Sequence, residues 1–267
     1  ARLRGLGAQI IKVEPITGDQ LAGLCPTWYK SLVEGQQVLR LNLKDKEDRS
    51  QLDQLLKASD FLLTSIRRAA LKRLSLDWPE LHAHFPRLSH VAIVGYSAPN
   101  EDKAGHDLTY QAEAGLVTPP DLPRTVLGDL ATAERVVSTV LALLVARGRD
   151  QRGLCSEVAL IDVTQDLADP WRYGVTTPDG ALGGGFPGYN LYRAASGWIA
   201  LAALEPHFWA RLQTELGLSN PTREDLARIF LTRDAAEWEA WSTARDLPLT
   251  AVRETSHAND QCVDDGD

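Results

Sequence analysis

The regular alternation of short apolar runs with amphipathic segments most limits what this chain can fold into. The apolar runs predict strands within 6–14, 38–43, 61–64 and 91–94. Between them, segments 45–56, 69–74 and 76–85 carry leucines and other apolar residues at helical spacing. Strands that alternate with helices pair in parallel, because each connecting helix returns the chain to the end of the sheet at which the previous strand began. The pattern predicts an α/β fold whose parallel sheet is covered by helices on both faces.

A long apolar helix is predicted over residues 129–149. Valine, leucine and alanine are almost continuous between 136 and 146, so we expect most of this helix surface to be buried. A shorter helix is expected at 107–115, before a break rich in proline, and a further strand at 157–162.

A glycine- and proline-rich segment predicts a division of the chain. Residues 174–188 include Gly-Gly-Gly-Phe-Pro-Gly, which is typical of a linker or loop. We therefore expect a large domain over 1–173 and a small α/β domain over 189–255. The small domain would hold a hairpin at 190–204 and helices at 206–216 and 222–245. An acidic tail would follow at 256–267.

Composition narrows the class of protein. The chain has 44% hydrophobic and 24% charged residues and no run of 18 apolar residues, which favours a globular fold without membrane spans. A net charge of −8 argues against a general nucleic-acid-binding surface. The three cysteines are too few and too scattered for a disulfide framework or metal knuckle, so we expect a reduced, cytoplasmic setting.

The common cofactor motifs are missing. Gly5-Leu6-Gly7 precedes the first predicted strand, whereas a dinucleotide fingerprint follows it, so NAD binding is not supported. There is no phosphate-binding loop ending in Gly-Lys-Ser/Thr and no Gly-x-Ser-x-Gly elbow. His82 and His84 do not have zinc spacing. We therefore expect no metal, NAD or flavin.

Three polar residues lie where predicted elements meet. His106 enters a helix from a polar loop and could act as a base near neutral pH, although a surface histidine beside an Asp107 N-cap is the simpler interpretation. Asp129 starts the long helix and could be a reactive carboxylate or an N-cap. Glu205 precedes Pro206 and fits either a helix N-cap or an acidic residue of a site.

Taken in order, the motifs of the chain resemble those of the family III CoA-transferases of the carnitine dehydratase and bile-acid-inducible type, a family that includes 2-methylacyl-CoA racemases. The similarity spans about 200 residues in seven ordered blocks. These blocks are Gly7–Pro15, Leu41–Lys44, Gly105–Ala112, Gly128–Ala131, Arg152–Asp162, Gly183–Arg193 and Ala203–Phe208.

The resemblance implies a Rossmann-like large domain, a smaller α/β domain and a homodimer of interlocked chains. It implies an acyl-CoA thioester as the substrate. Carried over by position, the CoA site includes Leu41, Ser65, Ile66, Arg73 and Leu74. The guanidinium of Arg73 suits a phosphate, although a solvated helix residue is the alternative.

Two chemistries are implied for this scaffold. In the racemases, residues matching His106 and Asp129 face opposite sides of the α-carbon and exchange its proton, and a glutamate matching Glu205 orients the histidine. In the transferases, the residue matching Asp129 attacks the thioester and forms covalent intermediates. The imidazole at position 106 and the carboxylate at 205 favour proton transfer. A non-catalytic CoA-binding homologue is the third alternative.

The chain departs from the family pattern in four places, one of which is the returning C-terminal segment, expected to be short or absent. The family's N-terminal strand and its following loop have no counterpart ahead of Ala1. Segment 31–37 replaces the usual Asn-Arg-Gly-Lys, which puts the adenine pocket in doubt. Ile66-Arg67-Arg68 stands where the family has an aromatic residue, arginine and proline.

Overall fold

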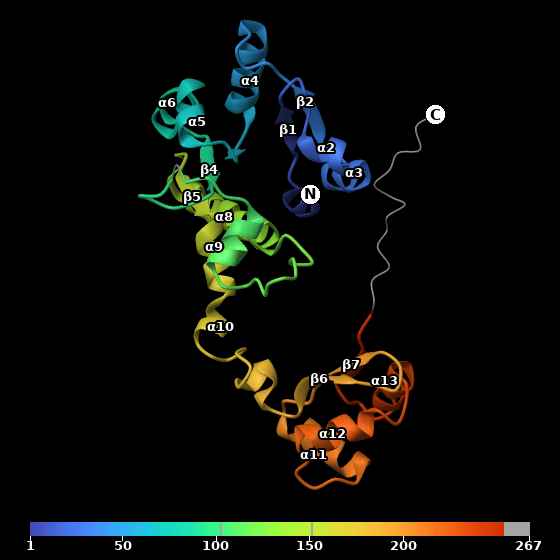
Figure 1. Cartoon of the computed structure of the whole chain (residues 1–267). Coiled ribbons are helices and arrows are strands. Elements are labelled where there is room, and N and C mark those ends of the chain that lie inside the picture. The colour runs from blue at the N-terminus through green and yellow to red at the C-terminus, as the bar shows by residue number, and fades with distance from the viewer. Residues whose placement is uncertain (102, 151, 254–267) are drawn as a thin grey trace, which may run out of the picture. The chain divides into compact units, whose positions relative to one another are not determined.

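The computed structural model describes residues 1–101, 103–150 and 152–253. They form two compact units that divide between Leu167 and Ala168, and each is considered on its own (Figure 1). The expected linker, residues 174–188, follows this division in the chain, and the expected domain limits stay predictions. The expected tail, residues 256–267, lies outside the described part of the chain.

The first unit contains two parallel sheets. In the smaller sheet, β1 (Ile11–Glu14) pairs with β2 (Gln37–Arg40). In the larger sheet, β4 (Ser89–Val94) lies between β3 (Phe61–Thr64) and β5 (Cys155–Ala159). Each pairing is parallel because helices occupy the crossover that joins the two strands. The expected mixed α/β class with parallel sheets is confirmed.

The helices of the first unit follow the apolar spacing of the sequence. In α4, Asp45 is the N-cap and accepts hydrogen bonds from the N–H groups of residues 47 and 48, while Leu52 and Leu56 are buried. The helices are α1 (Arg2–Gly5), α2 (Gln20–Leu24), α3 (Pro26–Val33), α4 (Lys46–Ala58), α5 (Arg68–Arg73), α6 (Trp78–His84), α7 (Asp107–Glu113), α8 (Leu127–Asp150) and α9 (Leu160–Leu167).

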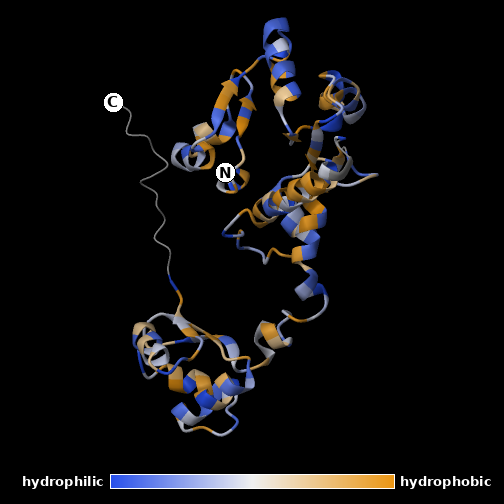
Figure 2. Cartoon of the chain, turned by 180° about the vertical axis from the view of Figure 1, so that it is seen from behind, coloured by the Kyte–Doolittle hydropathy of each residue, from blue (hydrophilic) through white to orange (hydrophobic). Residues whose placement is uncertain are grey.

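The long helix α8 is less buried than its sequence predicted. Val136 and Val140 are buried, but Leu141 is 43% and Val145 is 65% exposed in this chain. The helix contacts α1, α7, α9, β4 and β5, but these elements leave part of its apolar surface exposed. Figure 2 shows the hydropathy of each residue along the chain. The expectation that most of α8 is buried is therefore wrong for the single chain.

The predicted strand at 157–162 is also corrected. The strand β5 ends at Ala159 and α9 begins at Leu160, with Ile161, Val163 and Thr164 on its buried side. The apolar run from 158 to 161 is shared by the two elements, and a run this short does not show by periodicity where a strand ends.

The second unit is built on an antiparallel sheet. The predicted hairpin is confirmed by β6 (Tyr189–Arg193) and β7 (Trp198–Ala202), and β8 (Leu249–Ala251) adds a third strand that the sequence analysis missed. The remaining elements are α10 (Asp169–Arg172), the π-helical turn η1 (Ala181–Gly185), α11 (Pro206–Leu216), α12 (Arg223–Phe230) and α13 (Ala235–Thr243).

One predicted helix of the second unit is two helices. The expected helix at 222–245 is interrupted after Phe230, and a new helix starts where the backbone N–H of Asp234 donates to the carboxylate of Glu237 at 3.0 Å. The break lets Phe230 and Trp238 meet edge to face at 5.1 Å in the core. The fully buried members of that core are Ile199, Ala203, Leu212, Leu226 and Phe230.

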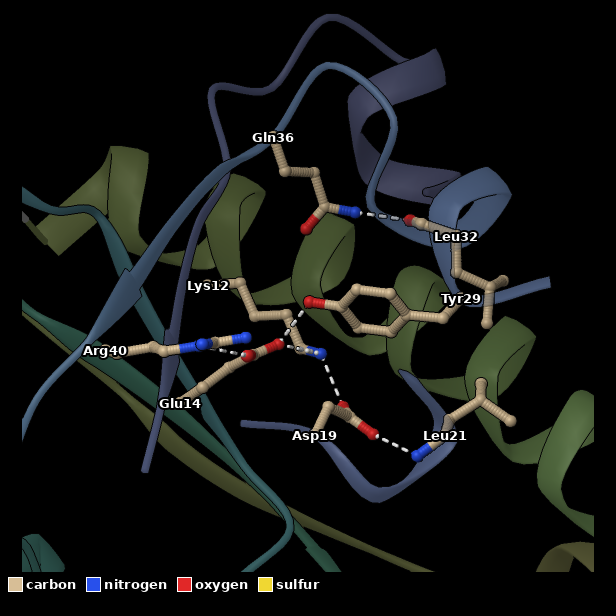
Figure 3. A network of polar contacts seen from close by, with 8 residues as sticks. All are labelled: Lys12, Glu14, Asp19, Leu21, Tyr29, Leu32, Gln36 and Arg40. Atoms are coloured by element: carbon tan, nitrogen blue, oxygen red, sulfur yellow. Dashed lines mark hydrogen bonds and ion pairs between the residues drawn. The ribbon is translucent and has the colours of Figure 1, made fainter. Parts of the chain in front are cut away.

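A buried carboxylate joins the elements of the smaller sheet (Figure 3). Glu14, 3% exposed, accepts hydrogen bonds from Lys12 Nζ at 2.7 Å and Tyr29 Oη at 2.5 Å. Lys12 also donates to Asp19, at the start of α2, and Arg40 of β2 lies 3.8 Å from Glu14 Oε2. The network therefore connects both strands with α2 and α3.

We expect this network to weaken in acid. Burial alone would raise the pKa of Glu14, but the hydrogen bonds from Lys12 and Tyr29 outweigh it and lower that pKa. The hydrogen bond from Lys12 likewise lowers the pKa of Asp19. A carboxyl whose pKa is lowered by folding stabilises the fold at pH values above its ordinary, unfolded-state pKa. This contribution is lost as the pH falls through the folded-state pKa.

Replacement of Glu14 tests this network. Glu14→Gln should lower the opening free energy of β1 and β2 by about 1–3 kcal/mol, because the hydrogen bond from the charged Lys12 loses its charged acceptor. It should also reduce the acid sensitivity of these strands. Hydrogen exchange of peptides covering the two strands, measured by mass spectrometry against pH, checks both effects. Glu47→Gln on the exposed start of α4 is the control, and equal protection in the two variants would contradict the prediction.

Candidate active site

His106 lies at the entrance to α7, beyond the carboxyl end of β4. It is exposed and holds the N-cap position with an extended backbone. Its N–H donates to Thr109 Oγ1 at 3.0 Å, and that hydroxyl donates back to the His106 carbonyl at 2.8 Å. The interpretation of Asp107 as the N-cap is wrong, because Asp107 is the first residue of the helix itself.

Asp107 directs its carboxylate toward the start of α8. The residue is only 7% exposed, and its Oδ1 accepts the backbone N–H of Asp129 at 3.0 Å. Its Oδ2 accepts a hydrogen bond from Gln111 Nε2 at 2.5 Å, and the same amide group donates to the carbonyl of Thr125 at 3.1 Å. The Gly-His-Asp and Gly-Asp motifs, more than twenty residues apart, are therefore joined directly.

Gly128 allows this close approach of α7, α8 and α9. A Cβ atom on Gly128 would lie 2.5 Å from Thr164 Oγ1 of α9 and 3.1 Å from Asp107 Oδ1. Thr164 is fully buried and its hydroxyl donates to the Leu160 carbonyl at 2.7 Å, so it has little freedom to move aside. The glycine is needed here for space rather than for an unusual backbone conformation.

Asp129 is the third residue of α8, so its interpretation as an N-cap is wrong. The spacing of 129, 136 and 140 places it in line with the buried residues Val136 and Val140. The residue is exposed as a whole, but partial burial of its carboxyl raises its pKa, and the charge of Asp107 raises it further. His106 acts in the opposite direction, so the structure brings these two predicted residues within electrostatic reach.

Tyr110 completes this neighbourhood and was missed by sequence analysis. Its ring is buried and lies against Gly95 and Gly105, where an added Cβ would approach within 2.5 Å. Burial raises the pKa of its hydroxyl, Asp129 raises it further, and Arg67 lowers it. The helical spacing of 107, 110 and 111 was the available signal, because it places three polar side chains on the buried side of α7.

Glu205 lies in the second unit. It is the N-cap of α11, followed by Pro206 as the sequence suggested, and its carbonyl accepts the N–H of Trp209 at 3.0 Å. The expected pairing of Glu205 with His106 stays a prediction.

The expected CoA-site residues differ in accessibility. Leu41 is 5% exposed and packs in the core of the first unit. Ser65 and Ile66 are exposed directly after β3. Arg73 is exposed in the last turn of α5, and the half-buried Leu74 follows it. Their role in binding CoA stays a prediction.

A hollow of about 470 Å³ lies between α8 and α9 but on another side of α8 from Asp129. Helical rotation places its α8 residues, such as Glu134 and Ser138, roughly opposite Asp129 at about 100° per residue. The hollow therefore does not contain the carboxylate.

Two further searches bear on the class of site. Within the described residues, no three His, Cys, Asp or Glu side chains are grouped so that they could hold a metal ion. No helix in the same part of the chain is long and apolar enough to cross a membrane.

The known proteins that match most of this chain include a racemase and a CoA-transferase. Alpha-methylacyl-CoA racemase of Homo sapiens is 27% identical over 252 residues, covering 83% of this chain and 66%, just under two thirds, of that protein. Succinyl-CoA:mesaconate CoA-transferase of Haloarcula marismortui is 25% identical over 284 residues, covering 91% of this chain and 70% of that protein.

The fold is matched by a crystal structure of the hypothetical protein Rv3272 from Mycobacterium tuberculosis, with a TM-score of 0.82 and 24% identity over 96% of this chain and 79% of that chain. The sequence model of CoA-transferase family III matches residues 2–266. Because that match spans nearly the whole chain, the protein belongs to CoA-transferase family III.

Proposed function

We propose that this chain binds an acyl-CoA thioester and transfers a proton at its α-carbon, with His106 and Asp129 as the two exchanging groups. The observation that carries the proposal is the direct packing of the two motifs, which leaves the imidazole and the carboxylate within electrostatic reach of each other. The similarity to an alpha-methylacyl-CoA racemase supports the same reaction.

The thioester carbonyl acidifies the α-proton. One of the two groups removes this proton, and the electron pair of the broken C–H bond moves onto the thioester oxygen as an enolate. The other group then delivers a proton to the opposite face of the carbon, so that no oxidant or second substrate is needed. Glu205 would orient the imidazole of His106 and stabilise its protonated form.

The raised pKa of Asp129 suits this task. A carboxyl whose pKa moves toward the working pH exchanges protons with a carbon acid better than an ordinary aspartate does. Proton removal by Asp129 requires the ionised form. We therefore expect that activity to decline, on acidification, at a higher pH than an unperturbed aspartate would allow.

The second candidate is CoA transfer through a covalent intermediate on Asp129. The similarity to succinyl-CoA:mesaconate CoA-transferase favours it. The carboxylate would attack the thioester carbonyl and expel CoA thiolate, giving a mixed anhydride. The thiolate would attack the aspartyl carbonyl of that anhydride, releasing the donor acid as its carboxylate and leaving CoA on Asp129 as a thioester. The acceptor carboxylate would displace the thiolate from this thioester as a second mixed anhydride, and attack of the thiolate on the acceptor's carbonyl would release the new acyl-CoA and free Asp129. A non-catalytic CoA-binding protein is the third candidate, which CoA-dependent thermal stabilisation without turnover would identify.

The same proposal assigns the CoA moiety to the strand ends of the first unit. Leu41, Ser65, Ile66, Arg73 and Leu74 would line its site. The exposed guanidinium of Arg73 would contact a phosphate, and the buried Leu41 would contribute through its backbone. A Rossmann-like arrangement of the large domain and a cytoplasmic location are parts of the proposal.

We further propose a homodimer of the interlocked type. The outer side of α8 supports it, because Leu130, Leu141, Leu144 and Val145 are 38–65% exposed on one helical face. An exposed apolar face of this kind is typical of a protein–protein interface. A second copy of the chain would cover it.

An isotope experiment tests the proton transfer. Incubation with one enantiomer of a 2-methylacyl-CoA in D₂O should introduce α-deuterium and invert configuration, as measured by mass spectrometry and chiral analysis. Asp129→Asn and His106→Ala should each slow the exchange by at least about 100-fold, because each removes one proton-transfer group. Asp121→Asn in the exposed loop before α8 is the control. Lack of both exchange and inversion over several acyl lengths would exclude this reaction.

Covalent capture tests the second candidate. Incubation with acyl-CoA and hydroxylamine should convert Asp129 to its hydroxamate if an anhydride forms, and peptide mass spectrometry would locate the change. Asp129→Ala should abolish transfer to an added carboxylic acid. Full turnover by this variant rules out the covalent path.

The dimer is tested through the outer face of α8. In size-exclusion chromatography with light scattering, the wild-type chain should have the mass of two copies. The mass of the double variant Leu141→Asp, Val145→Asp should shift toward that of one copy, because the variant places charges in the apolar contact. Leu122→Asp, in a loop where the leucine is 73% exposed, is the matched control. A monomeric wild-type protein would contradict the proposed homodimer.

A further inference from the structure

The start of α8 depends on a side chain from another helix. The first N–H groups of a helix lack partners within it and are usually met by the side chain of the N-cap residue. Here the residue before the helix is Val126, whose carbonyl accepts the Leu130 N–H at 3.1 Å but whose side chain has no acceptor. The N–H of Asp129 is met by Asp107 Oδ1 at 3.0 Å instead.

The Asp107 carboxylate is itself held in place. Gln111, only 2% exposed, donates to its second oxygen and anchors the loop before α8 through the Thr125 carbonyl. Gly128 and the buried Thr164 fix how closely α8 can approach. These contacts together fix the orientation of the Asp107 carboxylate relative to the backbone N–H of Asp129.

From this geometry we propose that Asp107 is the positioning residue for Asp129. Its buried carboxylate caps α8 from outside the helix, fixes the backbone from which the Asp129 side chain projects, and places a second carboxylate beside it. The inference deepens the proposed function and rests on Asp129 being the reactive carboxylate.

The surrounding charges agree with this role. Burial raises the pKa of Asp129, Asp107 raises it further, and His106 opposes both. Tyr110 of α7 and Arg67 before α5 belong to the same neighbourhood. On α9, Asp162 accepts a hydrogen bond from Ser97 and Asp166 pairs with Arg135. Next to burial, the charge of Asp107 therefore has the largest effect on the pKa of Asp129.

Two substitutions separate the cap from the charge. Asp107→Asn keeps an oxygen that can accept the Asp129 N–H but removes the negative charge, so Asp129 should titrate at lower pH. Asp107→Ala removes both, and the Asp129 amide should also exchange with deuterium about tenfold faster or more. The rate of α-proton exchange in Asp107→Ala should fall by about 100-fold, since misplacement by an ångström costs that much.

The titration of Asp129 is measured without turnover, by ¹³C NMR of protein labelled at aspartate carboxyl carbons. Asp129→Asn identifies the signal. Glu113→Gln is the matched control, because it removes a carboxylate from the same helix that pairs with Lys103 and Tyr96 instead. This control should leave both the titration and the amide exchange of Asp129 unchanged.

The outcomes distinguish the two proposals. If Asp107→Asn moves the titration but no thioester reacts, the proposed function fails and the positioning role of Asp107 stands. If Asp129 titrates and exchanges as in the wild type in both Asp107 variants, the positioning role is overturned, whatever the activity. Should Asp107→Ala fail to fold, Gly128→Ala replaces it. Its methyl group would displace α8 without changing a charge, and faster exchange of the Asp129 amide is again expected.

Discussion

The hydrogen bond from the Asp129 N–H to the Asp107 carboxylate is the contact on which the candidate site depends. It links two helices that approach the end of the larger sheet from separate parts of the sequence. A buried carboxylate is costly unless its oxygens have donors, and here both do. Burial of the Asp129 carboxyl raises its pKa, and the charge of Asp107, which the same contact brings near, raises it further. Structural stability and the chemistry proposed for the site therefore rest on one pair of residues.

Much of the fold could be predicted because local patterns decide it. The strand at 61–64, the hairpin with its turn at Ser196-Gly197 and the helix at 206–216 each carry their own signal in neighbouring residues. The errors arise where tertiary packing decides instead. The apolar run at 158–161 is divided between β5 and α9. The apolar surface of α8 exceeds what the single chain can cover, which no periodicity could show.

The site was only partly predictable for a related reason. The sequence indicated polar residues at the ends of elements, and His106, Asp129 and Glu205 do lie there. It could not show which of two adjacent residues, His106 or Asp107, faces inward, because both are polar residues at the start of the same helix. That choice depends on a partner 22 residues away and on the space that Gly128 leaves for it. The roles of these residues and of the CoA-site positions remain predictions.

The raised pKa of Asp129 does not by itself separate proton transfer from CoA transfer. A more basic carboxylate is both a better base toward a carbon acid and a better nucleophile toward a thioester. The difference between the two reactions lies in the second group, since only proton transfer needs an acid on the opposite face of the α-carbon. His106 is exposed at the start of α7, with its backbone fixed by Thr109, so its imidazole is accessible to a substrate. The choice between the reactions therefore depends on whether that imidazole faces the α-carbon of the bound substrate opposite Asp129.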